Sequence, residues 1–125
     1  MARAKPRKHA SPRKISETFL EFTAPLIEAL GAEATDDQLE NVLKIGFTVW
    51  NAVVIDATNP RRRFVEHMRK TIAHDEMIEM LVERLIERKH LLFRHDHRLI
   101  GNYQLYRDRG ELRLRAEARR PHARS

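Results

Sequence analysis

The fold of this chain is decided by residues 35–60, which read TDDQLENVLKIGFTVWNAVVIDATNP. Thr35 and Gln38 have the spacing of a capping box, in which each side chain bonds the backbone N–H of the other residue. Apolar residues then recur at steps of three and four, which indicates one broad buried face. We therefore predict a central helix over residues 36–58. Its buried stripe consists of Leu39, Val42, Leu43, Gly46, Phe47, Trp50, Val53, Val54 and Ala57.

Gly46 lies in the middle of this stripe, where glycine costs about 1 kcal/mol of helix propensity relative to alanine. We expect another helix to pass close to it. Ile45, Val49 and Ile55 add apolar surface away from the stripe, which favours neighbours on several sides of this helix. The helix should end before Pro60, because the residue preceding a proline avoids the helical conformation.

A second apolar stripe lies upstream, over residues 16–30. Ser16 is a favourable N-cap for this helix, and Gly31 is typical of the residue that follows a helix end. Pro25 lacks a backbone N–H, so we expect a kink or a restart near residues 21–24. The stripe consists of Phe19, Leu20, Phe22, Leu26, Ile27 and Leu30.

Two shorter helices are predicted downstream. Asn59 and Pro60 have the pattern of an N-cap followed by a first helical residue, so the third helix should begin there and continue to about residue 72. The helical spacing of apolar residues is then interrupted between Ile72 and Met77, which indicates a break over residues 71–74. A fourth helix follows to about residue 92, with Asp75 or Thr71 as its cap. Its predicted core face is Ile78, Leu81, Val82, Leu85 and Leu92.

After Phe93 the apolar period changes from 3.6 to two, which is typical of strands, and Asp108-Arg109-Gly110 is a turn signal. The apolar positions are Leu99, Gly101, Tyr103 and Leu105, then Leu112, Leu114, Ala116 and Ala118. These residues predict a C-terminal β-hairpin.

The register of the hairpin follows from its faces. If Arg107 lies opposite Leu112, Leu105 pairs with Leu114, and the apolar residues share one side. A slip of one residue would pair Arg107 with Glu111 but mix the two faces, so we favour the first register. Because an isolated two-stranded hairpin is marginally stable in water, its apolar face should pack on the helices.

The predicted fold class is therefore α+β and mainly α, with about four helices followed by the hairpin. We expect a disordered basic head over residues 1–14, one globular domain over residues 15–118 and a disordered basic tail over residues 119–125. The head contains two prolines and no large apolar residue after Met1, so it cannot bury enough surface to offset its ordering entropy.

Charge is sorted by position along the chain. Residues 1–14 carry six Lys or Arg and no acid, residues 15–60 carry eight acids and only Lys44, and residues 61–125 carry seventeen Lys or Arg against ten acids. The formal net charge is +6. Such segregation favours contact with polyanions or acidic surfaces.

Several classes of protein are disfavoured by composition. The absence of cysteine excludes disulfides, thiolate zinc sites and cysteine nucleophiles. The N-terminus has no apolar signal segment, and no stretch is long and apolar enough for a membrane span. We therefore expect a cytoplasmic protein with no membrane contact.

The charged feature that most specifically suggests a binding site is the run of three arginines Arg61, Arg62 and Arg63. Free N–H groups at a predicted helix start, together with arginine side chains, are suited to bind a phosphate. The alternatives are a solvated turn or ion pairs with Asp56 or with the acidic helices. A second set of predicted nucleic-acid contacts comes from the head and the hairpin: Arg3, Lys5, Arg7, Lys8, Arg13, Lys14, Arg113 and Arg115.

No catalytic motif accompanies these charges, and we expect no cofactor. The histidines allow one metal hypothesis, in which His90, His95, Asp96 and His97 hold a zinc ion between the fourth helix and the hairpin. A polar connector with surface histidines explains the same residues.

The sequence thus predicts a small non-enzymatic protein that binds nucleic acid, a ribosome-like surface or an acidic protein. One alternative is a module that forms a homodimer through the exposed edge of its hairpin. The other is a metal-dependent enzyme with its site at residues 90–97.

Overall fold

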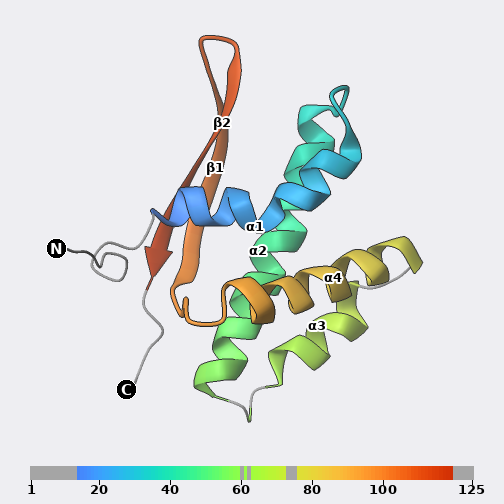
Figure 1. Cartoon of the computed structure of the whole chain (residues 1–125), viewed down its shortest axis with the longest axis vertical. Coiled ribbons are helices and arrows are strands. Elements are labelled where there is room, and N and C mark those ends of the chain that lie inside the picture. Colours follow the sequence, from blue (N-terminus) through green and yellow to red (C-terminus); the bar gives the residue numbers. More distant parts are fainter. Residues whose placement is uncertain (1–13, 60, 62, 73–75, 120–125) are drawn as a thin grey trace, which may run out of the picture.

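The computed structural model describes residues 14–59, 61, 63–72 and 76–119. This part of the chain forms four helices followed by one antiparallel hairpin (Figure 1), which confirms the predicted class. The helices are α1 (Ile15–Leu30), α2 (Asp36–Thr58), α3 (Phe64–Ile72) and α4 (Glu76–Leu92). The strands are β1 (Leu99–Asp108) and β2 (Glu111–Arg119), so Arg119 belongs to the sheet and not to the predicted tail.

Helix α2 is central, as its sequence predicts. The capping box is present, with the backbone N–H of Gln38 donating to Thr35 Oγ1 and the N–H of Thr35 donating to Gln38 Oε1. The helix packs against α1, α3, α4 and β1. Trp50 and Val49 are fully buried, so the hydrophobic core surrounds the middle of α2.

Helix α1 passes close to α2 at Gly46. A Cβ atom added at Gly46 would lie 2.5 Å from Cγ2 of Thr23 and 3.4 Å from a ring carbon of Phe19. The expected close approach of a second helix is therefore confirmed, and α1 is the helix concerned.

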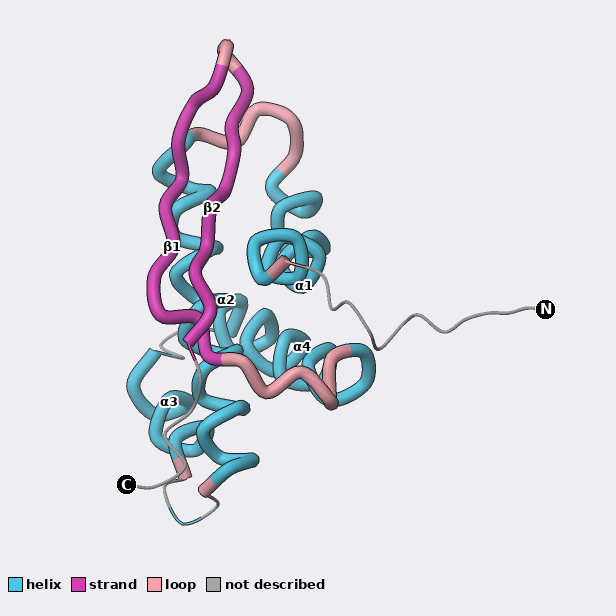
Figure 2. Tube along the Cα trace, turned by 90° about the vertical axis from the view of Figure 1, so that its left-hand side faces the viewer, coloured by secondary structure: helices cyan, strands magenta, loops and turns pink. Residues whose placement is uncertain are grey.

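Helix α1 differs from its prediction at its start. Its N-cap is Lys14, and Ser16 lies inside the first turn, so the predicted N-cap was wrong. Of the two outcomes expected near Pro25, the kink is confirmed, because the helix continues through Pro25 while Figures 1 and 2 show it changing direction near its middle. Since Pro25 cannot donate to the carbonyl of Glu21, that oxygen instead accepts a hydrogen bond of 2.8 Å from Arg88 of α4.

The third and fourth helices need two corrections. Helix α3 begins at Phe64 and not at Pro60, because the chain first makes a turn that includes Arg63 at φ 54°. The predicted break between α3 and α4 is confirmed. Asp75, a candidate N-cap of α4, lies outside the described residues. Leu92, predicted in the core, is 63% exposed because α4 ends there. None of the helices in the described ranges is long and apolar enough to cross a membrane.

The hairpin has the favoured register. Arg107 pairs with Leu112, Leu105 with Leu114 and Tyr103 with Ala116. Arg109 and Gly110 form the two-residue turn at φ 56° and 81°, the positive values that a type I′ turn requires. A bulge at Gly101 shifts the register near the start of β1.

One face of the hairpin packs on α1 and α2, as predicted, and the other face points away from the helices (Figure 2). The ring of Tyr103 contacts Phe19 of α1 and Phe47 of α2, with centroid distances of 5.7 and 5.2 Å. Ile100, Leu114 and Ala116 are buried on this inner face. The helices thus form one layer and the hairpin a second layer on one side of it.

Candidate polyanion-binding surface

The outward face of the hairpin carries the two strand arginines predicted to contact nucleic acid. Arg113 and Arg115 are exposed and pair across the sheet with Tyr106 and Gln104. The guanidinium carbon of Arg115 lies 5.7 Å from the centroid of the Tyr106 ring. Arg113 forms ion pairs with Asp108 and Glu111 of the turn, so its charge is already partly neutralised.

Two further cations lie at the end of β2 where the described chain begins and ends. The first turn of α1 is held against β2 because Ser16 Oγ bonds the backbone N–H and carbonyl of Ala116 at 2.7 and 3.2 Å. This contact brings the start of α1, with exposed Lys14, beside the strand that carries Arg115 and ends at exposed Arg119.

Lys14, Arg115 and Arg119 form no ion pair with any carboxylate in the described ranges. They are defined here as the terminal basic cluster. Exposed Glu117 lies between Arg115 and Arg119 along β2, on the same face of the strand. The predicted contacts Arg3, Lys5, Arg7, Lys8 and Arg13 lie outside the described residues, but they are joined to this cluster through Lys14.

The predicted anion site at residues 61–63 does not have the expected geometry. The arginines precede α3 and do not lie inside its first turn, and Arg62 is outside the described residues. The N–H groups of Phe64 and Val65 donate to the carboxylate of Asp56 at 2.7 and 3.0 Å. Asp56 thus occupies the position that a phosphate was expected to take.

The arginine side chains of that linker remain on the surface. Arg61 and Arg63 are exposed, and Arg63 makes a long 4.0 Å contact with Glu66. The linker lies at the far end of α2 from the hairpin turn (Figure 1), whereas Asp36 at the start of α2 pairs with Arg107 near that turn. The structure therefore does not bring Arg61 and Arg63 together with the hairpin arginines.

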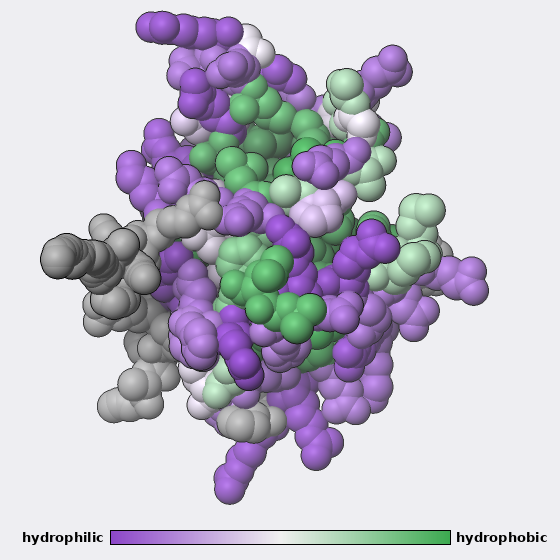
Figure 3. All heavy atoms as spheres, viewed as in Figure 1, coloured by the Kyte–Doolittle hydropathy of each residue, from purple (hydrophilic) through white to green (hydrophobic). Residues whose placement is uncertain are grey.

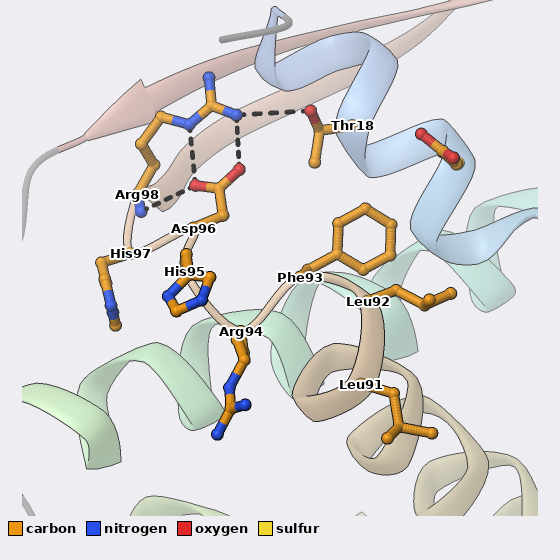
Figure 4. A pocket seen from close by; sticks show the side chains of 10 residues that line it. Thr18, Leu91, Leu92, Phe93, Arg94, His95, Asp96, His97 and Arg98 are labelled. Carbon is orange, nitrogen blue, oxygen red and sulfur yellow. Dashed lines mark hydrogen bonds and ion pairs between the residues drawn. The ribbon is translucent and has the colours of Figure 1, made fainter. Parts of the chain in front are cut away.

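The junction between α4 and β1 does not form the hypothesised zinc site. Asp96 is held by Arg98 through hydrogen bonds of 2.6 and 2.9 Å, and Arg98 also reaches Thr18 of α1 (Figure 4). His95 and His97 do not point toward the Asp96 carboxylate (Figure 4). Within the described ranges, no three His, Asp or Glu side chains gather as metal ligands would.

The electrostatics of this junction favour an ion pair that stabilises the loop. Burial would raise the pKa of Asp96, but the hydrogen bonds and charge of Arg98 outweigh it and hold the pKa below its ordinary value. The groove beside it measures about 960 Å³ and is lined by polar loop residues and by Leu91 and Leu92. Both leucines are exposed, and Figure 3 shows apolar surface over this end of α4.

Lys89 is the ionisable residue that sequence reasoning missed. It is 2% exposed and donates to the carbonyls of Phe93 and Asp96 at 2.6 and 2.9 Å, with its ammonium 4.4 Å from the centroid of a Trp50 ring. Burial lowers its pKa to about 8, although Asp96 acts in the opposite sense. Lys89 follows Leu85 by four residues on the core stripe, and that spacing was the available signal.

The buried ammonium of Lys89 donates to two backbone carbonyls, so it caps the C-terminal end of α4 and fixes the loop that follows. It presents no nucleophile to the groove.

Comparisons with family models, with characterised proteins and with solved structures find no match for this chain.

Proposed function

We propose that this chain is a small non-enzymatic binding protein that contacts the phosphate backbone of nucleic acid through the terminal basic cluster and the basic segments joined to it. One observation carries the proposal. Lys14 and Arg119 lie at the end of the hairpin opposite its turn, and Arg115 lies in the middle of β2 on the outward face. None of the three forms an ion pair with a carboxylate of the described ranges.

Phosphate is the chemistry that this surface suits best. Arginine presents forked donors to phosphate oxygens, and further Lys and Arg residues add counterion release. Residues 1–13 carry five Lys or Arg, residues 120–125 carry two more, and both segments attach at the cluster. The exposed amides Asn102 and Gln104 and the Tyr106 ring share the outward face and supply further hydrogen-bonding and stacking groups.

We expect this binding to be insensitive to base sequence. Backbone contacts position a protein on nucleic acid without reading bases. The outward face offers one aromatic ring beside an arginine, which suits stacking on any exposed base.

The test is fluorescence anisotropy of the full chain with a labelled DNA duplex and a labelled single-stranded RNA over a series of salt concentrations. Arg115→Gln/Arg119→Gln should weaken binding and lower the slope of log K against log salt by about two, one for each lost phosphate contact. Deletion of residues 1–13 should lower the slope further.

Lys70→Gln/Arg84→Gln is the control. It removes the same charge from exposed positions on α3 and α4, so it should leave the slope close to that of the unmodified chain. If both double variants lose equal affinity, net charge alone explains binding and the cluster is not a site. If neither nucleic acid binds at low salt, the proposal is wrong.

The linker arginines are tested in the same assay. Arg61→Gln/Arg62→Gln/Arg63→Gln should reduce the salt slope if the linker adds phosphate contacts at the far end of α2. An unchanged affinity and slope would remove these three residues from the binding surface.

A further inference from the structure

The two edges of the hairpin are not equivalent. The edge of β2 lies against α1, where Ser16 occupies both backbone groups of Ala116. Every second residue of β2 is also charged, namely Glu111, Arg113, Arg115, Glu117 and Arg119. Charge on an edge strand discourages pairing with another chain, so β2 is protected in two ways.

The outer edge of β1 is held only at its start. Asn51 of α2 bonds Ile100 as a neighbouring strand would, donating to its carbonyl at 2.9 Å and accepting from its N–H at 2.8 Å. Gly101 then forms the bulge, and beyond it no side chain of the described residues bonds the backbone of β1 on this edge.

The direction of the free groups on β1 follows from Ser16. Because the polar groups of Ala116 point away from β1, Ala116 and Tyr103 are a non-hydrogen-bonded pair. Such pairs alternate along an antiparallel ladder, so Leu105 and Arg107 are in the same position as Tyr103. The N–H and carbonyl groups of these three residues therefore point outward.

Most of β1 has no charge to protect this edge, since residues 99–106 read LIGNYQLY. The two charged residues that follow are already paired, Arg107 with Asp36 at 2.7 Å and Asp108 with Arg113 at 3.5 Å. A long uncharged edge with outward backbone groups is a template for another strand. We propose that this strand is β1 of a second copy of the chain.

The pairing that fits is antiparallel, with a two-fold axis at Leu105. Leu105 then faces Leu105 of the second copy, and Tyr103 faces Arg107 of that copy on both sides of the axis. Three such pairs exchange about six hydrogen bonds, which use all of the free groups. The result is a four-stranded sheet in the order β2, β1, β1 and β2.

A second copy suits this edge better than an unrelated strand because the edge is complementary to itself. The free groups are spaced evenly about Leu105, and the two-fold axis keeps the helices of both copies on one side of the sheet. On the outward face Gln104 lies across from Tyr106 of the second copy, so no like charges meet.

The first test is the mass of the full chain in solution, measured by sedimentation without nucleic acid over a range of concentrations. The unmodified chain should dimerise with rising concentration. Leu105→Pro should stay monomeric, because proline removes an outward N–H donor while the internal ladder of the hairpin is kept. Leu112→Pro is the matched control, since it removes an outward N–H from β2 and should still dimerise.

Gln104→Lys keeps the inference testable if Leu105→Pro does not fold. It introduces a charge at an exposed position near the two-fold axis, and the dissociation constant should rise at least about tenfold. Dimerisation that Leu112→Pro abolishes as fully as Leu105→Pro would assign the interface to the other strand and overturn the proposal. So would an unmodified chain that is monomeric at every concentration.

The register is tested by cross-linking, which is clean because the natural chain has no cysteine. Across a hydrogen-bonded pair the Cα atoms are about 5.5 Å apart, a separation that a disulfide can span. Leu105→Cys should form a covalent dimer on oxidation, whereas Leu112→Cys should not. Arg115→Gln/Arg119→Gln should not change either result, so a failure of nucleic-acid binding and a failure of dimerisation can be told apart.

Discussion

Ser16 and Ala116 are joined by two hydrogen bonds across 100 residues of chain, with the serine hydroxyl accepting from the N–H of Ala116 and donating to its carbonyl. A single side chain therefore acts as a short piece of neighbouring strand. The contact fixes the hairpin on α1 and covers part of one sheet edge.

Ser16→Ala should lower the free energy of unfolding by about 1–3 kcal/mol, because two backbone groups lose their partner at a half-buried position. Urea denaturation followed by circular dichroism measures the change. Thr48→Ala is the control, since the Thr48 hydroxyl bonds only Lys44 within its own helix and its removal should cost less. Equal losses for the two variants would contradict the role given to Ser16.

Asp56→Ala should destabilise α3, because the Asp56 carboxylate caps the first N–H groups of that helix. The expected loss is about 1–2 kcal/mol in urea denaturation. Asp56→Asn keeps one oxygen acceptor, so it should lose less stability than Asp56→Ala. Amide hydrogen exchange should show faster exchange at Phe64 and Val65 in the alanine variant, and unchanged exchange there would refute the cap.

Gly46→Ala should be destabilising although alanine is the better helix former. The new methyl group would meet Thr23 Cγ2 at 2.5 Å, and overpacking of this kind costs about 1–3 kcal/mol. Thr23→Ser removes the clashing methyl group and retains the hydroxyl that bonds Phe19. The double variant Thr23→Ser/Gly46→Ala should therefore be more stable than Gly46→Ala alone, and a purely additive double variant would argue against the clash.

Lys89→Met should destabilise the protein near pH 7 by about 1–3 kcal/mol, because the carbonyls of Phe93 and Asp96 lose their donor. The exposed residue Lys44 provides the control variant Lys44→Met, which should have little effect.

The difference in stability between the unmodified chain and Lys89→Met should also depend on pH. The pKa of Lys89 is about 8 in the folded chain and 10.5 without its surroundings, so between these values the unfolded chain binds more protons. Stability of the unmodified chain should therefore rise relative to Lys89→Met as pH increases from about 8 to 10.5. A constant difference between the two proteins across that window would show that the pKa is not lowered.

The elements that could be predicted from sequence are those set by local spacing. The capping box of Thr35 and Gln38 needs only three residues of separation, and the hairpin register follows because a shift by one would expose Leu105 and Leu114. Gly46 was informative because a glycine inside a buried helical stripe lets a second backbone come close, which is the gain that offsets its low helix propensity.

The features that could not be predicted depend on partners distant in sequence. Ser16 satisfied the local rule for an N-cap, and nothing near it indicated Ala116. Asp56 caps a helix that starts eight residues later, so the start of α3 and the partners of its N–H groups were both misplaced. The arginines at residues 61–63 remain a prediction as a binding site, although their helix-start geometry was wrong.

The contact between Ser16 and Ala116 also has a consequence for the order in which the chain assembles. The hairpin is synthesised after the four helices, and contacts of long sequence separation form slowly because loop closure must come first. The helices can pack together earlier, but the sides of the Phe19 and Phe47 rings that contact Tyr103 stay exposed until the hairpin docks. We therefore expect docking of the hairpin to be a late step, and a nascent chain that does not yet include Ala116 to keep an uncovered aromatic face that a chaperone can bind.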